Sequence, residues 1–408
     1  TANFIQYRNM NILYFADSDI TINKGGVNRV THFLSREFMN MPGWKCYLAY
    51  LNESKVLPVS EFNGKIHVSA DKANEQIKEF IETRQITQII VNLTTKKNIY
   101  FSLPILYALK SEFPNLHIIF CYHTYPGCEL FGIPPGIGLR RLLHLPDRMN
   151  TLKSIIQYIV GKTPFSGISK ACIRHKYRFI YDHCDRLVLL SPHYIPRYAE
   201  LADIKGANHI IAIPNPLSLP EILSPDQLIR KHKEVLIVAR LTEPVKRLSL
   251  ALKIWQIIEK TESYNDWKLV ILGNGEDELY YKTLAHKLGL KNISFEGRKE
   301  PLEYYRRASI FMMTSLYEGW GLTLVEAQQM GVVPIAFESY EALQDMIRNH
   351  DNGILIPDRH IHEYAAQLKE LMTDFCKREE IAVNALASCR QFSIGHIIQK
   401  WCRLFSNL

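Results

Sequence analysis

The sequence has no long hydrophobic run. Apolar stretches such as Val235–Ala239 and Ile310–Met313 hold only five and four residues, whereas a helix that spans a membrane needs about 18 or more. The first ten residues show no basic segment followed by an apolar one, so no secretory signal is expected. We therefore expect a cytoplasmic protein without a transmembrane segment.

Cysteine pairs and cysteine–histidine clusters are also missing. The eight cysteines are scattered, with no C-x-x-C pair and no zinc-ligand spacing. In a chain of this length without a secretory signal, such cysteines are expected to remain reduced thiols. The pattern therefore gives no support to a disulfide framework, a zinc site or cysteine-based catalysis.

Most of the chain has no excess of charge of either sign. The net charge is +8, from 49 Lys+Arg against 41 Asp+Glu. Positions 140–178, here called the basic segment, hold nine cations and one acid, Asp147, so they supply 9 − 1 = +8 and leave the remainder balanced at 40 against 40. The nine cations are Arg140, Arg141, Arg148, Lys153, Lys162, Lys170, Arg174, Lys176 and Arg178.

The length and the order of apolar runs predict two α/β domains. A chain of 408 residues exceeds the roughly 250–300 residues at which one hydrophobic core stops growing. In the first half, the expected strands alternate with helical patterns, which is typical of a parallel sheet. These strands are Asn11–Ala16, Gln88–Val91, Leu116–Cys121 and Arg186–Leu190, and a glycine loop separates the first of them from an expected helix over Val27–Met39.

A second alternation follows Ile213–Pro216, where each proline disfavours a helical conformation of the residue before it. The expected strands are Glu234–Ala239, Lys268–Leu272, Ile293–Phe295, Ile310–Thr314 and Val332–Ala336. The expected helices are Leu248–Glu259, Asp277–Lys287, Leu302–Ala308, Leu324–Met330, Ala342–Ile347, Ile361–Thr373, Lys377–Cys389 and Ile394–Phe405. We therefore predict two facing, doubly wound Rossmann-like domains, residues 1–214 and 217–391, with residues 392–408 packing back on the first. Ligands of such folds bind at the carboxyl ends of the strands.

The strongest local motif runs from Thr314 to Ala327 and places Glu318 and Glu326 on either side of a Gly-Trp-Gly turn. The turn predicts a loop position for Glu318 and a place in the first helical turn for Glu326. Backbone N–H groups at residues 321–323 would then form an anion site at a helix N-terminus. Two alternatives remain open: Glu318 is an ordinary exposed loop residue, or Thr323 and Glu326 form a capping box.

A second motif carries two cations after a buried strand, Arg240 and Lys246. A guanidinium and an ammonium at a strand-to-helix junction can hold a diphosphate, each hydrogen bond contributing about 1.5–3 kcal/mol. The alternative is that both are solvated loop cations that pair with Glu243.

Taken together, the Arg240…Lys246 pair, Gly273-Asn274-Gly275 and the Glu318…Glu326 motif resemble the C-terminal half of a retaining GT-B glycosyltransferase. The family is the large "glycosyl transferases group 1" family, of the glycosyltransferase family 4 type. The match is strongest over Val235–Ile347, and the first half agrees only in outline. Ala239 stands where the family usually has glycine, and Phe337–Glu341 lacks the glycines often found there, which puts sugar-side contacts of that loop in doubt.

The resemblance implies a role for each matching residue. Arg240 and Lys246 would bind the diphosphate of a nucleotide-sugar donor and stabilise it as the leaving group. Glu318 would bind the sugar hydroxyls and Glu326 the ribose. The remaining residues implied to contact the donor are Gly319, Trp320, Gly321, Leu322 and Thr323 at the sugar and phosphates, Gly273 and Arg298 at the base, and Gly25 and Gly26 at the phosphates.

His123, at the end of an expected strand, would face the donor sugar, with an ordinary core or surface histidine as the alternative. Asp17-Ser18-Asp19 matches a D-x-D metal motif, but it closes the first strand and is interpreted as loop polarity. We therefore expect no metal and no cofactor. The predicted reaction is the retaining, metal-independent transfer of a hexose to a glycan or lipid-linked acceptor. A UDP-sugar is the favoured donor, and GDP-mannose is the second choice.

The basic segment combines cations with apolar faces, a composition typical of an interfacial amphipathic helix. It predicts peripheral docking on an anionic, inner-leaflet membrane surface; the alternative is a solvated helical face packed within the domain. Two other functions stay open for the whole chain: a sugar-nucleotide epimerase or phosphorylase of similar layout, and a non-catalytic membrane- or nucleic-acid-binding module. RNA-binding signatures are absent, so no nucleic-acid partner is expected.

Overall fold

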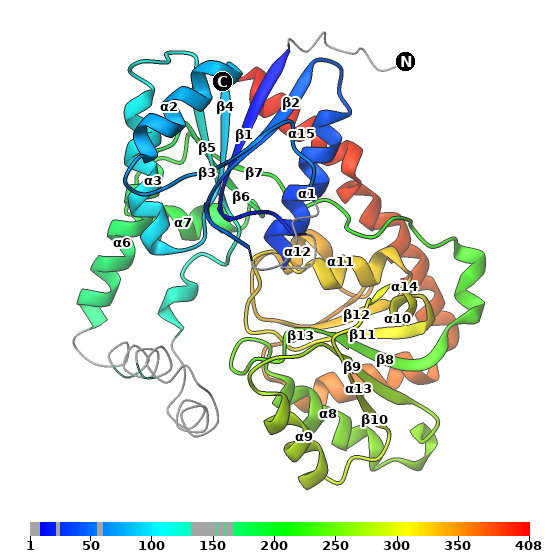
Figure 1. Ribbon diagram of the computed structural model, residues 1–408. Helices are drawn as coiled ribbons and strands as arrows, with labels where there is room; N and C mark the ends of the chain where they lie inside the picture. Colours follow the sequence, from blue (N-terminus) through cyan, green and yellow to red (C-terminus); the bar gives the residue numbers. More distant parts are fainter. Residues whose placement is uncertain (1–8, 22–24, 55–59, 132–151, 153–158, 160–165) are drawn as a thin grey trace. The chain divides into compact units, whose positions relative to one another are not determined.

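The computed structural model describes residues 9–21, 25–54, 60–131, 152, 159 and 166–408 (Figure 1). The chain divides into two units. Unit 1 comprises Thr1–Pro126, Ala171–Ser218 and Phe392–Leu408, and unit 2 comprises Gly127–Lys170 and Leu219–Gln391. Residues 127–131 thus group with unit 2, although the sequence placed them in the first domain; Phe131 stacks on Tyr317, with ring centroids 5.2 Å apart.

Unit 1 contains, among its described residues, a parallel sheet of seven strands in the order β3-β2-β1-β4-β5-β6-β7. The strands are β1 Met10–Ser18, β2 Trp44–Asn52, β3 Lys65–His67, β4 Gln88–Asn92, β5 His117–Tyr122, β6 Arg186–Leu189 and β7 Ile210–Ala212. The helices are α1 Gly26–Met39, α2 Ala73–Arg84, α3 Lys96–Leu109, α6 Ser166–Asp182 (which belongs to unit 1 from Ala171 onward), α7 Tyr194–Ala202 and α15 Ile394–Ser406. The reversal of strand order beside β1 places the carboxyl ends of β1 and β4 at a topological switch point, where α/β folds bind ligands.

Unit 2 contains a parallel sheet whose described strands run in the order β10-β9-β8-β11-β12-β13. The strands are β8 His232–Val238, β9 Lys268–Leu272, β10 Ile293–Gly297, β11 Ala308–Met313, β12 Val333–Glu338 and β13 Ile354–Pro357. The α-helices are α8 Leu248–Glu259, α9 Glu278–Lys287, α10 Leu302–Arg307, α11 Leu322–Gln329, α12 Leu343–Met346, α13 Ile361–Thr373 and α14 Phe375–Ser388. Short 3₁₀ helices lie at Cys128–Leu130, Pro225–Arg230, Glu262–Tyr264 and Cys389–Phe392. The two doubly wound α/β sheets confirm the predicted fold class.

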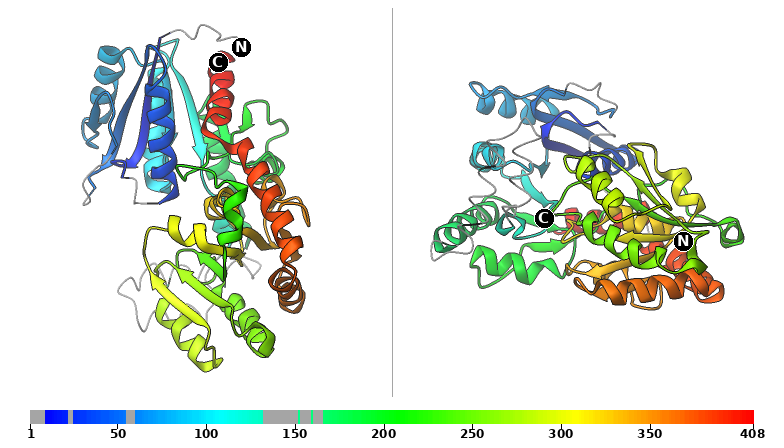
Figure 2. Two further views of the ribbon diagram at one scale, coloured as in Figure 1. Left: turned by 90° about the vertical axis from the view of Figure 1, so that its right-hand side faces the viewer. Right: turned by 90° about the horizontal axis from the view of Figure 1, so that it is seen from below.

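The C-terminal helix α15 packs on α1 within unit 1 (Figure 2). The ring of Phe38 on α1 lies 6.2 Å from that of Trp401 and 5.7 Å from that of Phe405, and Phe405 also meets Trp44 at the start of β2. Aromatic side chains of this size bury 150–250 Å² each. This cluster therefore attaches the end of the chain to unit 1, although the residues before it belong to unit 2.

Much of the basic segment lies outside the described residues, but α6 carries its last cations. Arg174 lies 3.4 Å from Asp203, and Arg178 donates to Asp182 at 3.0 Å. Lys176 is buried and lies over the rings of two tyrosines, Tyr122 and Tyr177. Three of the nine cations therefore have partners inside unit 1. None of the described helices is long and apolar enough to cross a membrane.

Candidate functional site

Two glycines bring the ends of β8 and β9 together in unit 2. Gly273 has φ +138, and a Cβ on it would lie 1.8 Å from the carbonyl oxygen of Ala239. A Cβ on Gly275 would lie 2.4 Å from the carbonyl oxygen of Leu241, whose N–H donates to Asn274 at 2.8 Å. The two loops are thus in backbone contact, and glycine is required there by the packing of the protein itself.

Gly273→Ala should lower the free energy of unfolding by about 3 kcal/mol or more, because the new methyl group adds a backbone clash to an unfavourable φ. Gly289→Ala is the matched control: its φ is +72, but nothing lies within 4 Å of the added Cβ, so only about 1–2 kcal/mol should be lost. Urea unfolding measures both variants. Equal losses in the two would show that the contact with Ala239 is not the constraint.

The cations of the β8 loop line one cavity in unit 2. The cavity measures about 410 Å³, and its lining includes Arg240, Lys246, Thr242, Glu276 and Tyr317. Arg240 is 70 % exposed and donates to Glu276 at 2.5 Å, whereas Lys246 is 19 % exposed and donates to Glu318 at 2.5 Å. The structure thus brings both predicted diphosphate ligands and the predicted sugar ligand into one neighbourhood.

The alternative in which these cations pair with Glu243 is wrong. Glu243 is buried, and its carboxylate accepts hydrogen bonds from the Ser249 hydroxyl at 2.9 Å and the Tyr281 hydroxyl at 2.7 Å. Its backbone N–H donates to Asp277 at 2.7 Å. The side chain of Glu243 thus holds the loop, whereas Arg240 and Lys246 pair with Glu276 and Glu318.

Arg247 ties the β8 loop to the loop after β11, and sequence reasoning assigned it no role. It is buried, and it donates to the carbonyl oxygens of Thr314 at 2.8 Å and Ser315 at 2.9 Å. Its guanidinium also donates twice to Asp358, at 2.7 and 3.2 Å. In sequence it resembles a second solvated cation beside Lys246; only its contacts show that it positions the Lys246–Glu318 pair.

The loop after β11 holds Glu318 as predicted, but the helix that follows differs from the expectation. Glu318 also accepts a hydrogen bond from the Ser315 hydroxyl at 2.7 Å. Gly321, with φ +108, is the N-cap of α11, and no side chain caps the helix. Thr323 therefore lies inside the helix, and the alternative of a capping box formed by Thr323 and Glu326 is wrong.

Glu326 is the fifth residue of α11, two positions further into the helix than the expected start at Leu324 would place it, and it is buried. Its carboxylate accepts a hydrogen bond from the Tyr305 hydroxyl at 3.0 Å. A buried carboxylate needs such a partner. The position is compatible with the ribose contact that the resemblance implies, and that role stays a prediction.

The other predicted donor ligands of unit 2 surround these residues. Gly319, Leu322 and Thr323 are half-buried and Trp320 is buried. The first N–H groups of a helix have no acceptor within the helix, so the start of α11 offers donors to an anion. Arg298 is exposed after β10, and the preceding residue, Gly297, accepts a backbone hydrogen bond from Gly273 at 2.8 Å.

Glu276 and Tyr317 line the cavity and were not selected from the sequence. Glu276 is the partner of Arg240. Tyr317 stacks on Phe131 with an angle of 21° between the rings, and burial raises the pKa of its hydroxyl. Tyr317 lies next to Glu318 in the motif, a position that could have drawn attention to it.

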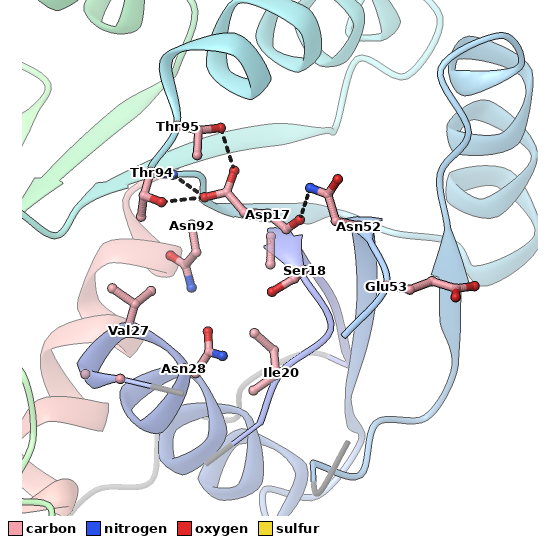
Figure 3. Close-up of a pocket in the computed structure, with 13 residues that line it drawn as sticks. Asp17, Ser18, Ile20, Val27, Asn28, Asn52, Glu53, Asn92, Thr94 and Thr95 are labelled. Atoms are coloured by element: carbon pink, nitrogen blue, oxygen red, sulfur yellow. Dashed lines mark hydrogen bonds between the residues drawn. The ribbon is translucent and has the colours of Figure 1, made fainter. Parts of the chain in front are cut away.

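Unit 1 has a pocket of about 440 Å³ at the carboxyl ends of β1 and β4 and the start of α1 (Figure 3). Gly25 and Gly26 line it, as do Ala16, Asp17, Ser18, Ile20, Val27, Asn28, Asn52, Glu53, Asn92, Thr94 and Thr95. Gly25 has φ +115 and open space around its Cβ position. This glycine is therefore needed for the turn into α1.

The carboxylates of the Asp17-Ser18-Asp19 motif bond to different partners. Asp17 accepts hydrogen bonds from the N–H of Thr94 at 2.7 Å and from the hydroxyls of Thr94 and Thr95 (Figure 3). It also accepts one from the amide of Asn98 at 2.6 Å. Asp19 pairs with Lys65 at 3.0 Å. Asp17 thus joins the end of β1 to the start of α3, and the two carboxylates do not converge.

His123 follows β5 and is half-buried. Its Nε2 lies 2.9 Å from Oδ1 of Asn92. Burial lowers the pKa of His123 to about 4, since a charged ring would lose its hydration. The imidazole is therefore neutral at pH 7 and is suited to hydrogen bonding rather than to attraction of an anion.

Comparison with known proteins finds a family for part of the chain and relatives for about half of it. Residues 221–387 match the family described as "Glycosyl transferases group 1". The amylovoran biosynthesis glycosyltransferase AmsD of Erwinia amylovora is 28% identical over 57% of this chain and 65% of its own length. A Campylobacter jejuni α-1,4-N-acetyl-D-galactosaminyltransferase, named for an undecaprenol-diphosphate-linked substrate, is 28% identical over 57% of this chain and 62% of its own length. The chain thus spans less than two thirds of these relatives.

Solved structures agree over nearly the whole chain. HepE of Anabaena, crystallised with UDP, superposes with a TM-score of 0.71 at 15% identity and covers 98% of this chain and all of its own. The apo form of the lipopolysaccharide outer core galactosyltransferase WaaB gives a TM-score of 0.67 at 15% identity, with coverage of 98% and 100%. These likenesses show the GT-B fold. Residues 221–387, with the Arg240…Lys246 and Glu318…Glu326 motifs on its strand ends, belong to the glycosyl transferases group 1 family.

Proposed function

We propose that this protein is a glycosyltransferase that takes a sugar from a nucleoside-diphosphate donor bound by unit 2. The observation that carries the proposal is the single cavity lined by Arg240 and Lys246, with Glu318 paired to Lys246. Two cationic donors suit the charge of a diphosphate, and a carboxylate can accept hydrogen bonds from sugar hydroxyls. The UDP bound in the structure of HepE supports a UDP-sugar as the first choice, with GDP-mannose next.

In the proposed reaction, the bond between the anomeric carbon and the diphosphate oxygen breaks, and its electron pair leaves with the diphosphate. Arg240 and Lys246 would exchange their carboxylate partners for phosphate oxygens and stabilise that charge. The acceptor hydroxyl would bond to the anomeric carbon with retention of configuration, and its proton would pass to the departing diphosphate. The two cations are our reason for proposing that no metal is required.

The acceptor would bind in unit 1. The described lining of its pocket contains no lysine or arginine, and the carboxylate of Asp17 is taken up by the hydrogen bonds to Thr94, Thr95 and Asn98. Three asparagines, Asn28, Asn52 and Asn92, belong to the same lining and suit sugar hydroxyls, and its second acidic residue, Glu53, is exposed to solvent. We therefore propose an uncharged glycan residue, free or lipid-linked, as the acceptor, in polysaccharide or glycolipid assembly.

The deciding experiment offers the full chain a panel of UDP-, GDP- and ADP-sugars, with and without EDTA. Release of free sugar and nucleotide from a UDP-sugar, unchanged by EDTA, is the expected result. Conversion of the donor into an epimeric nucleotide sugar would favour the epimerase alternative. No turnover and no thermal shift with any nucleotide would overturn the proposal.

We also propose that the basic segment attaches the enzyme to an anionic membrane surface. The support is its sequence, in which six cations precede Arg174, and each cation near an anionic leaflet contributes about 1 kcal/mol. Vesicles of phosphatidylglycerol should sediment the protein at low salt, whereas phosphatidylcholine vesicles should not. Replacing Arg140, Arg141, Arg148 and Lys153 with glutamine should abolish sedimentation, and unchanged sedimentation would contradict the docking.

A further inference from the structure

A chain of hydrogen bonds connects the first turn of α1 to the ring of His123. The Thr31 hydroxyl lies 2.9 Å from the carbonyl oxygen of Val27, and the amide nitrogen of Asn92 lies 2.8 Å from the Thr31 hydroxyl. The amide oxygen of Asn92 lies 2.9 Å from Nε2 of His123. The three side chains come from α1, β4 and the loop after β5.

The chemistry of each group determines the direction of every bond in this chain. A backbone carbonyl can only accept, so the Thr31 hydroxyl must donate to Val27. The hydroxyl has then used its hydrogen and must accept from Asn92, which turns the amide NH₂ toward Thr31. The amide oxygen consequently faces His123 and can only accept, so Nε2 must carry the proton.

We infer that Thr31 and Asn92 hold His123 in its Nε2–H tautomer, so that Nδ1 presents a lone pair to a substrate hydroxyl. Asn92 and Thr31 are thus positioning residues, and His123 acts as a neutral hydrogen-bond acceptor. The role at the substrate rests on the function proposed above, whereas the tautomer follows from the contacts alone.

Burial and location support the inference. Thr31 and Asn92 are 1 % and 5 % exposed, so water does not compete for their hydrogen bonds. No hydrogen-bond partner of Nδ1 is present among the described residues, which leaves that atom available. Asn92 also lines the pocket of unit 1, and Val27 follows Gly25 and Gly26 in that lining (Figure 3).

The chain of hydrogen bonds from Val27 through Thr31 and Asn92 to His123, here called the relay, explains why the end of β4 carries an amide side chain. A leucine could not accept from His123, and the ring would be free to exchange its proton between the two nitrogens. An aspartate could still accept from Nε2–H. The inference therefore predicts different consequences for two substitutions of similar size at one buried position.

Nitrogen NMR of the full chain, with ¹⁵N-labelled histidine, tests the tautomer directly near pH 7. The His123 signals are assigned by their loss in His123→Gln. We expect a protonated Nε2 and an unprotonated Nδ1 in the wild type and in Asn92→Asp. Thr31→Val and Asn92→Leu should shift His123 to the Nδ1–H form or to a mixture.

Thr83→Val is the matched control, because Thr83 on α2 makes the same type of bond, to the carbonyl of Glu79 at 2.7 Å, outside the relay. It should change neither the tautomer nor turnover. Thr31→Val and Asn92→Leu should lower kcat about tenfold with little change in donor KM, and Asn92→Asp should keep more activity than Asn92→Leu.

A wild-type protein with its proton on Nδ1, or a tautomer unaffected by Thr31→Val and Asn92→Leu, would overturn the relay. If the tautomer shifts in the variants as expected but the wild-type protein turns over no nucleotide sugar, the relay is supported and the proposed function is contradicted. In a third outcome, the wild type has the expected tautomer, and Thr31→Val and Asn92→Leu lose it without a change in kcat. That result would contradict the contact of Nδ1 with a substrate hydroxyl.

Discussion

Lys246→Ala should lower turnover of the nucleotide sugar by about 10²- to 10³-fold, a loss typical of removing one preorganised donor from a developing negative charge. The effect has two parts. The leaving diphosphate loses a charge-assisted hydrogen bond, and the carboxylate of Glu318, which is only 16 % exposed, loses its cationic partner and repels the phosphates. Steady-state kinetics for donor hydrolysis and for transfer measure the change in kcat and KM.

The control for Lys246 is Lys282→Ala. Lys282 is 49 % exposed and pairs with Glu278 on the surface of α9, so turnover should stay at the wild-type level. Lys246→Arg should recover part of the activity, because it keeps the charge but changes its geometry. Turnover of Lys246→Ala within a few-fold of wild type would remove Lys246 from the diphosphate site.

Arg247→Ala should lower the free energy of unfolding by about 3–5 kcal/mol, the usual cost of removing one partner of a buried ion pair. The guanidinium is 6 % exposed. Its removal leaves Asp358 without its bidentate partner and the carbonyl oxygens of Thr314 and Ser315 without their donors. Donor KM should rise as well, since the same contacts hold the Lys246 and Glu318 loops together.

The measurement is urea unfolding followed by tryptophan fluorescence, to which Trp255, Trp267 and Trp320 contribute from unit 2. Arg348→Ala is the matched control. Arg348 is 64 % exposed and pairs with Asp351 on the surface, so its loss should cost about 1 kcal/mol or less. If both variants lose the same amount of stability, Arg247 does not act as a buried clamp.

Sequence patterns predicted the buried elements best. The bounds of α8, β9 and α13 are as expected, since each is a compact apolar run or stripe. The α3 helix was not predicted, and it holds a proline, Pro104, in its interior, which normally signals a helix break. The α2 helix was also not predicted; its apolar stripe is narrow, with Ile77, Phe80 and Ile81 as its large buried side chains.

The sequence by itself determined the α/β alternation and which charged residues stand at strand ends, because side-chain periodicity and turn chemistry are local properties. Only the tertiary structure decided which side chains these charged and polar residues pair with. Lys246 pairs with a carboxylate 72 positions away instead of the neighbouring Glu243, and Asn92 reaches Thr31 across 61 positions. Such pairings depend on which strand ends lie side by side, and strand order is set by packing of the whole sheet. Sheet packing also explains why Arg247, which looks like a surface cation in the sequence, is buried and joins the β8 loop to the loop after β11.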